Sequence, residues 1–460
     1  MKIPVRSPGI YDYEIFPAVA LKGTRETFEV RGLGAESALV PGNAYRIYVI
    51  PQEENISAVT LEISETGSYP FVETCADGSG VVRFDYTFTR EQIYTLRLCA
   101  VCADGSKKLS DLRVFCAEDD LYRRTPMRGN THCHTFRSPD GHEDPYLAAS
   151  FYRRAGFDFL AITDHHSAEG SADAIRAARD IPSEMALYPA EEVHVPNPYI
   201  HAVNIGALME GGVGLDSWYR GHREETDALV RAIAQEYASR LPEGIEPMDF
   251  AWRKWIADTV RENGGIAVIA HPFWEYDAHN TRDDMFRLLA REKIYDAAEI
   301  AHGQEPGCAD ANMQVAFWND LRAEGIYIPP LGTDDAHRRM FTWDYDSSFN
   351  EVCSVVFASD PSFAGFAQAV REGYTAAVEF YENAPQHVIA TYRLTKFTVF
   401  LLERYFPRHD DLCFEEGVLM RDAYLGDGEA LRSLERMNGR VRRYTDRFFG
   451  RRPDAGRTEK

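Results

Sequence analysis

The sequence has no long apolar stretch. No uninterrupted apolar run approaches the roughly 20 residues that a membrane-spanning helix needs. The opening residues, MKIPVRSPGIYDYEIF, also lack the apolar segment of a secretory signal. These absences argue against a membrane-spanning or secreted protein, and we expect a cytoplasmic one.

The sequence also lacks a disulfide framework, because its eight cysteines are scattered along the chain. Only Cys99 and Cys102 have CxxC spacing, and they lie inside the apolar run LRLCAVC. One such pair is more often two strand residues than half of a zinc site. This cysteine usage fits a reducing cytoplasm best.

Positive charge is scarce. The 460 residues include 50 Lys and Arg against 72 Asp and Glu, which gives a formal net charge of −22. Because a phosphate backbone needs a basic surface, this balance argues against general nucleic-acid binding. It does not exclude a small anionic substrate, since bound divalent metals invert the local sign of the charge.

The first 122 residues contain no histidine and have the pattern of a β domain. The segments AYRIYVIP, AVTLEIS, VVRFDYTF and IYTLRLCAV are β-branched and aromatic, and several alternate in the manner of half-buried strands. Pro41-Gly42, Asp77-Gly78 and Asp104-Gly105 supply turn chemistry between them. We predict an antiparallel, sandwich-like domain over residues 1–122, without chemistry of its own.

From residue 123 to residue 382, apolar runs alternate with helical patterns. Segments such as FDFLAITD, IHAVNIGAL, IAVIAHPF and IYIPPLGTD are the short continuous runs of buried parallel strands. Their alternation with helices predicts a parallel α/β sheet or barrel. Residues 210–263 read as a helical insertion that would cap the site. Residues 383–460 read as a helical extension with a disordered tail.

Twelve of the fourteen histidines lie from His132 to His337, and the most promising ones follow strand-like runs. Parallel α/β folds place their active sites at that end of the strands. In THCHTFRSPDG, His132 and His134 project to one side of an extended segment, and Asp140 follows in a turn. Two imidazoles on one face are half of a metal site, although two exposed histidines would give the same pattern.

Two further segments add donors. LAITDHH ends a strand with Asp164 and His165, a pattern that an N-cap and a polar turn also explain. In YPAEEVHVPNPYIHAVNIG, Glu191 and Glu192 point opposite ways on a regular strand, so only one of them enters the site. His201 then opens the next strand.

The last two segments complete the set. IAVIAHPF places His271 directly after a strand, where a hydrogen-bonded core histidine is the alternative. LGTDDAH gives Asp335 and His337 with the spacing of the first pair. A mixed nitrogen and oxygen set without cysteine suits zinc, manganese or iron. Because the set exceeds what one tetrahedral ion needs, we predict a cluster of two to three divalent metal ions.

The order HxH, D, TDH, E, H, HP and DxH resembles the PHP superfamily, the polymerase and histidinol phosphatase domain, over about residues 127–382. The resemblance implies a distorted (β/α)7 barrel with usually three metal ions. Matched position by position, it implies the ligands His132, His134, Asp140, His165, Glu192, His201, His271, Asp335 and His337. Two departures stand out. SPDG is one residue longer than the family's SDG, which leaves His142 as a rival to Asp140, and Ala190 replaces the usual glycine.

The β domain and the inserted helices also resemble, in architecture alone, the CehA/McbA-like branch, named for enzymes that hydrolyse a carbamate ester. We expect a metal-dependent hydrolase, foremost a phosphoesterase that acts on a small anionic phosphate ester through a metal-bridging hydroxide. Asp164, His302 and Arg338 are the candidate catalytic or phosphate-contacting residues, and a polar turn or surface role is the alternative for the last two.

Two other readings remain open. The same cluster would serve a carboxylic or carbamic ester hydrolase, and aromatic residues of the insertion and the loop after it would suit an aromatic substrate unless they belong to the core. These are Trp252, Trp255, Phe273 and Trp274. A non-catalytic binding module is the third reading, against which the full set of nine ligands argues.

Overall fold

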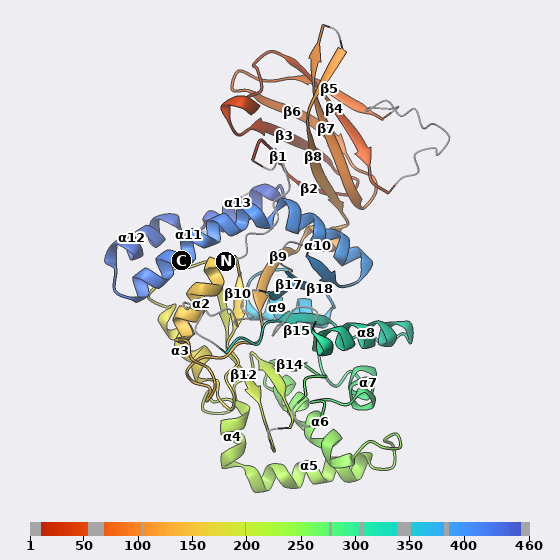
Figure 1. The fold of residues 1–460 in the computed structure, drawn as a ribbon, viewed down its shortest axis with the longest axis vertical. Helices are drawn as coiled ribbons and strands as arrows, with labels where there is room; N and C mark the ends of the chain where they lie inside the picture. Colours follow the sequence, from red (N-terminus) through yellow and green to blue (C-terminus); the bar gives the residue numbers. More distant parts are fainter. Residues whose placement is uncertain are drawn as a thin grey trace. The chain divides into compact units, whose positions relative to one another are not determined.

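The computed structural model describes residues 11–53, 69–103, 105–197, 199–275, 278–302, 308–337, 351–380 and 386–451 (Figure 1). The chain divides into two compact units. The first comprises residues 1–124, 399–409 and 439–460, and the second comprises residues 125–398 and 410–438. Residues 383–460 are therefore shared between the units. The predicted disordered tail beyond Arg451 and the predicted strand AVTLEIS lie outside the described residues.

The first unit contains two β-sheets. One is antiparallel, in the order β1 (Tyr13–Phe16), β3 (Arg25–Gly32) and β6 (Val81–Thr87). The other has the order β2 (Val19–Leu21), β8 (Gly105–Ala117), β7 (Gln92–Cys102), β4 (Ala44–Pro51) and β5 (Phe71–Cys75). Its pairs are antiparallel except β2 with β8. Alternate residues of β7 are buried, as the period of a half-buried strand requires, and Phe28, Leu96 and Val114 are fully buried in one apolar cluster.

The first unit also contains short helices and parts of longer ones. These are η1 (Ala35–Ser37), α1 (Asp119–Tyr122), α13 (Arg440–Phe448), the end of α10 (Tyr392–Arg404) and the start of α11 (Phe406–Tyr424).

The second unit is mixed α/β, which confirms that class for the middle of the chain. One sheet has the order β11 (Ala186–Tyr188), β10 (Phe159–Ala161), β9 (Thr125–Asn130), β17 (Val352–Ala358), β18 (Thr375–Glu379) and β19 (His387–Ile389). The other has the order β12 (Ala190–Val193), β13 (Ala202–Ile205), β14 (Ile266–Ile269), β15 (Ala297–His302) and β16 (Pro330–Thr333).

Two isolated parallel bridges join the sheets, one at each edge strand of the sheet that runs from β12 to β16. Cys133 pairs with Ala336 beyond the ends of β9 and β16, and His165 pairs with Glu192 beyond the end of β10. All four positions lie within one residue of a predicted metal ligand or are ligands themselves. The two seams between the sheets therefore run through the predicted site. A closed (β/α)7 barrel is a finer statement and stays a prediction.

Several neighbouring strands are antiparallel, where the sequence pattern predicted parallel ones. β12 with β13, β13 with β14, and β9 with β17 are all antiparallel. For β12 and β13 the reason is the connection, because the eight residues between Val193 and Ala202 are too few for a crossover helix.

Helices cover these sheets and form the insertion. They are α2 (Pro145–Arg154), α3 (Glu169–Ala177), α4 (Leu215–Gly221), α5 (Arg223–Tyr237), α6 (Pro247–Glu262), α7 (Asp283–Arg291), α8 (Ala309–Ala323), α9 (Phe363–Arg371) and α12 (Gly428–Met437). In the described part of the chain, no helix combines the length and the apolar character that crossing a bilayer demands.

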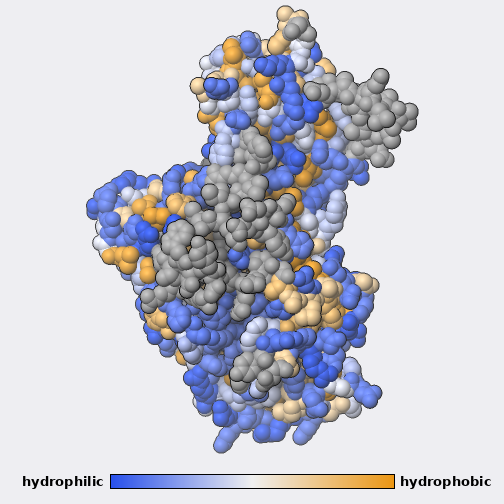
Figure 2. All heavy atoms as spheres, viewed as in Figure 1, coloured by the Kyte–Doolittle hydropathy of each residue, from blue (hydrophilic) through white to orange (hydrophobic). Residues whose placement is uncertain are grey.

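The insertion shares one apolar core with β13, β14 and β15 and has a polar outer surface. Trp252 and Trp255 on α6 and Phe273 after β14 are buried in the cluster beneath it. The face in view carries mostly hydrophilic residues over α4 to α6 (Figure 2). These three aromatic residues are therefore core residues, and only Trp274 of the suggested substrate-contacting set is partly exposed.

Candidate metal centre

The predicted ligands come from strand ends that meet at one edge. His132 and His134 follow β9, His165 follows β10, Glu192 lies in β12, His201 directly precedes β13, His271 follows β14, and Asp335 and His337 follow β16. The carboxyl ends of parallel strands meet at one edge of a sheet, which explains why residues far apart in sequence converge here. His201 fits because its strand runs the other way.

Glu192 lies at the middle of this cluster. Its Oε1 is 2.8 Å from His201 Nδ1 and 3.1 Å from His271 Nε2. Its Oε2 is 2.8 Å from His165 Nδ1 and 3.3 Å from His132 Nε2. The two oxygens thus face different histidines, which is the arrangement of a bridging carboxylate.

Asp335 is the second carboxylate that contacts several histidines. Its Oδ1 is 3.0 Å from His134 Nε2 and 3.2 Å from His132 Nε2, and those two nitrogens are 3.2 Å apart. Its Oδ2 is 3.2 Å from His302 Nε2. The geometry therefore adds His302 to the cluster as a partner of a predicted ligand.

A third group lies at the outer side of the cluster. Asp140 Oδ2 is 3.1 Å from His165 Nε2 and 3.5 Å from His337 Nε2. His134 belongs to the same group. His142, the rival of Asp140, is exposed and belongs to none of the candidate groups among the described residues. His165 presents one ring nitrogen to this group and the other to Glu192.

The arrangement fits metal ions better than it fits hydrogen bonds. Glu192 Oε2, Asp335 Oδ1, His165 Nδ1 and His194 Nε2 are buried without a hydrogen-bond partner among the described residues, although His165 Nδ1 and Glu192 Oε2 lie only 2.8 Å apart. These atoms lie close together without forming hydrogen bonds to one another, as the ligand atoms around a shared ion would. Buried polar atoms left without partners are costly, and a cation would satisfy them.

The electrostatics agree with this picture. Burial lowers the pKa of His134 to about 3 and that of His194 to about 4, so both rings are neutral, as ligands must be. Burial opposes protonation of His165 too, but Asp140 and Glu192 outweigh it and raise its pKa to about 10. Asp140 and Glu192 therefore stabilise a positive charge at the position of His165.

The centre is closed on one side and open on the other. The side chains of His132, Glu192 and Glu299 are at most 1% exposed. On the opposite side, the side chain of Asp140 is 50% exposed and that of His337 is 25% exposed. A substrate would reach the centre from the side of Asp140 and His337.

Two residues of the centre were not predicted from the sequence. His194 Nε2 is 3.4 Å from Glu192 Oε2. Glu299 on β15 accepts a hydrogen bond from His132 Nδ1 at 2.8 Å and one from the backbone nitrogen of His271 at 2.7 Å. The sequence contained features that could have identified both residues. His194 is two residues after Glu192 and so shares its face of an extended strand, and Glu299 is a carboxylate inside an apolar strand.

Replacing Glu299 by glutamine is expected to weaken metal binding about 10- to 100-fold. Glu299 orients the His132 ring so that Nε2 faces the centre, and such outer partners contribute roughly that factor. Competition with a fluorescent chelator would measure the affinity. Glu324→Gln is the control, because Glu324 lies in a partly exposed ion pair on the surface. Unchanged affinity in the Glu299 variant would contradict this role.

The three predicted catalytic residues have different positions. Both oxygens of Asp164 accept hydrogen bonds from Thr135 Oγ1, and Oδ1 also accepts one from the Thr135 backbone nitrogen, at 2.6 Å. Burial raises the pKa of Asp164 to about 6. Asp164 therefore ties the two ligand-bearing segments together. His302 lies beside Asp335, as described above. Arg338 lies outside the described residues.

A buried network holds the segments that carry the paired ligands. Asp334 Oδ1 accepts hydrogen bonds from Asn130 Nδ2 at 2.6 Å and from Tyr152 at 2.8 Å. Asn130 Nδ2 also donates to the carbonyl of His132 at 2.8 Å. All three side chains of the network are fully buried. It fixes His132 relative to Asp335 without contacting either side chain.

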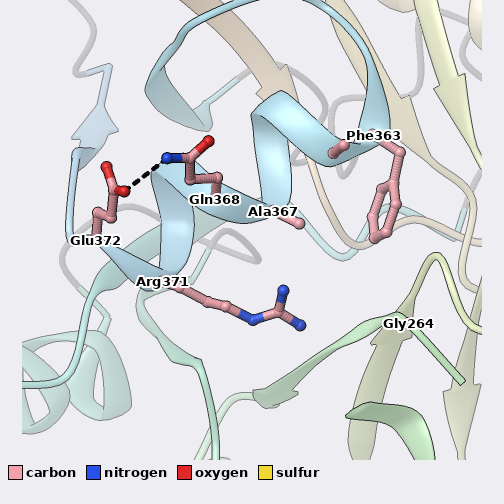
Figure 3. Close-up of a pocket in the computed structure, with 7 residues that line it drawn as sticks. Gly264, Phe363, Ala367, Gln368, Arg371 and Glu372 are labelled. Atoms are coloured by element: carbon pink, nitrogen blue, oxygen red, sulfur yellow. Dashed lines mark hydrogen bonds between the residues drawn. The ribbon is translucent and has the colours of Figure 1, made fainter. Parts of the chain in front are cut away.

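A separate cavity of about 460 Å³ lies beside α9. Its lining includes Phe363, Arg371 and Gly264 and contains none of the predicted ligands (Figure 3). Arg371 Nη2 donates to the carbonyl of Gly265 at 2.7 Å, and its Nε is 3.3 Å from Asp296. The arginine of this cavity is therefore already paired.

Comparison with solved structures finds matches at low sequence identity and low TM-score. A two-domain protein from Bacteroides vulgatus containing a predicted PHP-like metal-dependent phosphoesterase is 16% identical, with a TM-score of 0.38 over 56% of this chain and 66% of that one. This chain thus matches slightly under two thirds of that protein's length. An amidohydrolase from Chromobacterium violaceum with bound sulfate and no metal is 18% identical, with a TM-score of 0.30 over 48% and 89% of the two chains.

Endonuclease Q in complex with a 27-mer duplex substrate bearing an abasic lesion is 14% identical, with a TM-score of 0.32 over 54% of this chain and 57% of that one. No family model and no curated protein matches the sequence.

Proposed function

We propose that this chain is a metal-dependent hydrolase that cleaves a small phosphate monoester. The observation that carries the proposal is the environment of Glu192, whose two oxygens face different histidines across a centre of four candidate groups. A carboxylate so placed would hold two ions side by side, one at each oxygen. Paired ions suit a displacement in which both the attacking and the leaving oxygen carry charge.

The residues of this chain would hold and order the centre. His132, His134, His201, His271, Glu192 and Asp335 form the inner ligands of the proposed site, and Asp140, His165 and His337 form its outer group. Divalent ions such as zinc, manganese or iron would supply Lewis acidity there. Glu299 and Asp164 orient the segments, and the closed inner side keeps bulk water from the buried ligands. We also propose the distorted (β/α)7 barrel as the framework.

An ester hydrolase is the second candidate, and one residue favours it. The ring of Trp274 lies 5.5 Å from the rings of both His201 and His271. A partly exposed indole beside two predicted ligands would suit an aromatic carboxylic or carbamic ester. The buried positions of Trp252 and Trp255 remove the rest of the aromatic surface that this function would use.

We expect the purified enzyme to hydrolyse phenyl phosphate faster than phenyl acetate. A cluster with several ions stabilises a group with three charged oxygens, whereas a neutral ester gains mainly from one polarising ion. Chelation should abolish the phosphatase activity, and manganese or zinc should restore it. Release of phenol from both substrates measures the ratio, with metal content determined by elemental analysis. Strong turnover of the acetate without phosphatase activity would favour the second candidate instead.

A further inference from the structure

We propose that Arg220 on α4 binds a second anionic group of the substrate. The substrate would then be a small phosphate monoester that also carries a carboxylate or a further phosphoryl group. This inference rests on the proposed phosphatase function, and it names a specificity-determining residue outside the metal ligands. Four observations lead to it.

The first observation is that α4 contacts residues next to the predicted metal ligands. Asp216 Oδ2 lies 2.7 Å from His166 Nδ1 and accepts a hydrogen bond from the backbone nitrogen of His194 at 3.1 Å. Asp216 is only 1% exposed. One buried carboxylate of the insertion thus contacts two residues that flank predicted ligands, so the start of α4 has a fixed position beside the centre.

The second observation concerns the backbone of His166. It has a φ of +61°, a left-handed conformation that few residues other than glycine adopt. Its carbonyl accepts hydrogen bonds from Ser217 Oγ and from Arg220 Nη2, each at 3.4 Å. Together with the Asp216 contact, α4 holds His166 by three side chains. Arg220 is therefore directed toward the ligand-bearing loop.

The third observation is that Arg220 contacts a partly exposed residue next to the predicted ligand His165. The side chain of His166 is 41% exposed, in contrast to the closed inner ligands. Chain geometry limits the distance from Arg220 Nη2 to the Cα atom of His165 to about 10 Å, because His165 and His166 are neighbours. That span suits a small molecule whose phosphoryl group is at the centre and whose second anion is at Arg220.

The fourth observation is that the charge of Arg220 is not compensated. Among the described residues, no carboxylate lies within ion-pair distance of it, whereas Arg137 pairs with Asp173 at 2.6 Å and with Glu169 at 3.2 Å. In a chain with a net charge of −22, an uncompensated guanidinium beside the site is a specific recognition feature. Its planar fork matches a carboxylate or a phosphoryl group.

The test compares phenyl phosphate with 4-carboxyphenyl phosphate and with 4-phosphonophenyl phosphate in the manganese-loaded full-length enzyme. Wild type should prefer the compounds with the second anion, and the arm with the larger preference identifies which anion the site takes. Arg220→Gln should lower that preference roughly tenfold, which is the usual scale for a hydrogen bond to a charged group. Most of the loss should appear in KM, and Arg220→Lys should retain part of the preference.

Arg231→Gln is the matched control, since Arg231 is an exposed arginine on α5, the next helix of the insertion. It should leave the preference unchanged. Equal loss on all three substrates in the Arg220 variant, an unchanged preference, or the same effect in the Arg231 variant would overturn this inference while the phosphatase function stands. Absence of turnover of every phosphate by metal-loaded wild type would overturn both.

Discussion

Replacement of Glu192 by glutamine is expected to abolish hydrolysis and to remove most of the bound metal. The loss should exceed the roughly 10- to 100-fold that loss of an outer partner costs. Glu192 is the only carboxylate that faces His132, His165, His201 and His271 together in the described part of the chain. An amide keeps the shape of the side chain but replaces one anionic oxygen by a donor, which cannot ligate a cation.

Glu191→Gln is the matched control, because it makes the same chemical change one residue away on β12. Glu191 is fully buried and faces away from the cluster, where it accepts hydrogen bonds from Asn204 Nδ2 at 3.0 Å and from the backbone nitrogen of Leu215. Burial raises its pKa to about 7. Both hydrogen bonds go to Glu191 Oε1, which the glutamine keeps as a carbonyl acceptor, so the control variant should retain its fold and its metal.

Elemental analysis after purification without chelators, together with phosphatase rates, would measure both variants. We expect at least two ions per chain in wild type and in the Glu191 variant. Loss of metal in the Glu191 variant and not in the Glu192 variant would mean that the register of β12 is shifted by one residue. Less than one ion per wild-type chain would contradict the metal centre itself.

Replacement of Glu416 by alanine is expected to destabilise the second unit by about 3–5 kcal/mol, the usual cost of removing one partner of a buried ion pair. Glu416 on α11 contacts Arg153 on α2 at 2.7 Å. The Arg153 side chain is fully buried, and Asp158 at 3.0 Å is its other carboxylate partner. Glu416 also accepts a hydrogen bond from the backbone nitrogen of Glu184 at 2.6 Å.

Thermal unfolding followed by circular dichroism would show this as a lowered midpoint of the second unit. Glu429→Ala is the control, since Glu429 on α12 forms exposed ion pairs with Arg432 and Arg436 and should not change the midpoint. A double variant, Arg153→Met with Glu416→Leu, should recover much of the loss, because it removes both charges. An unchanged midpoint in Glu416→Ala would show that Asp158 alone neutralises Arg153.

The sequence was sufficient to predict most of the residues that gather, because strand ends in an α/β chain meet at one edge. His132, Glu192, His271 and Asp335 are separated by up to about two hundred residues, yet each is adjacent to a strand-like run. What local pattern could not show is pairing across the fold. Glu299 contacts a histidine 167 residues away, and no periodicity encodes such a contact.

The same limit applies to the helices. The periodicity of residues 383–460 predicted helices correctly, but it does not say which surface each helix covers, and α10 and α11 contribute to both units. The aromatic residues of the insertion show this limit as well. Trp252 and Trp255 have the spacing of a buried helix face, and only the structure distinguishes a core from a substrate-binding surface.

The bridges between the two sheets have a consequence for insertions and deletions. Glu192 pairs with His165 at a seam and also faces the histidines of the candidate centre, so a change of spacing along β12 would move this predicted ligand. Removing one residue between Tyr188 and Glu192 would present Glu191's side of the strand to the histidines. Length variation among natural relatives should therefore be concentrated in the loops between helices and avoid β12.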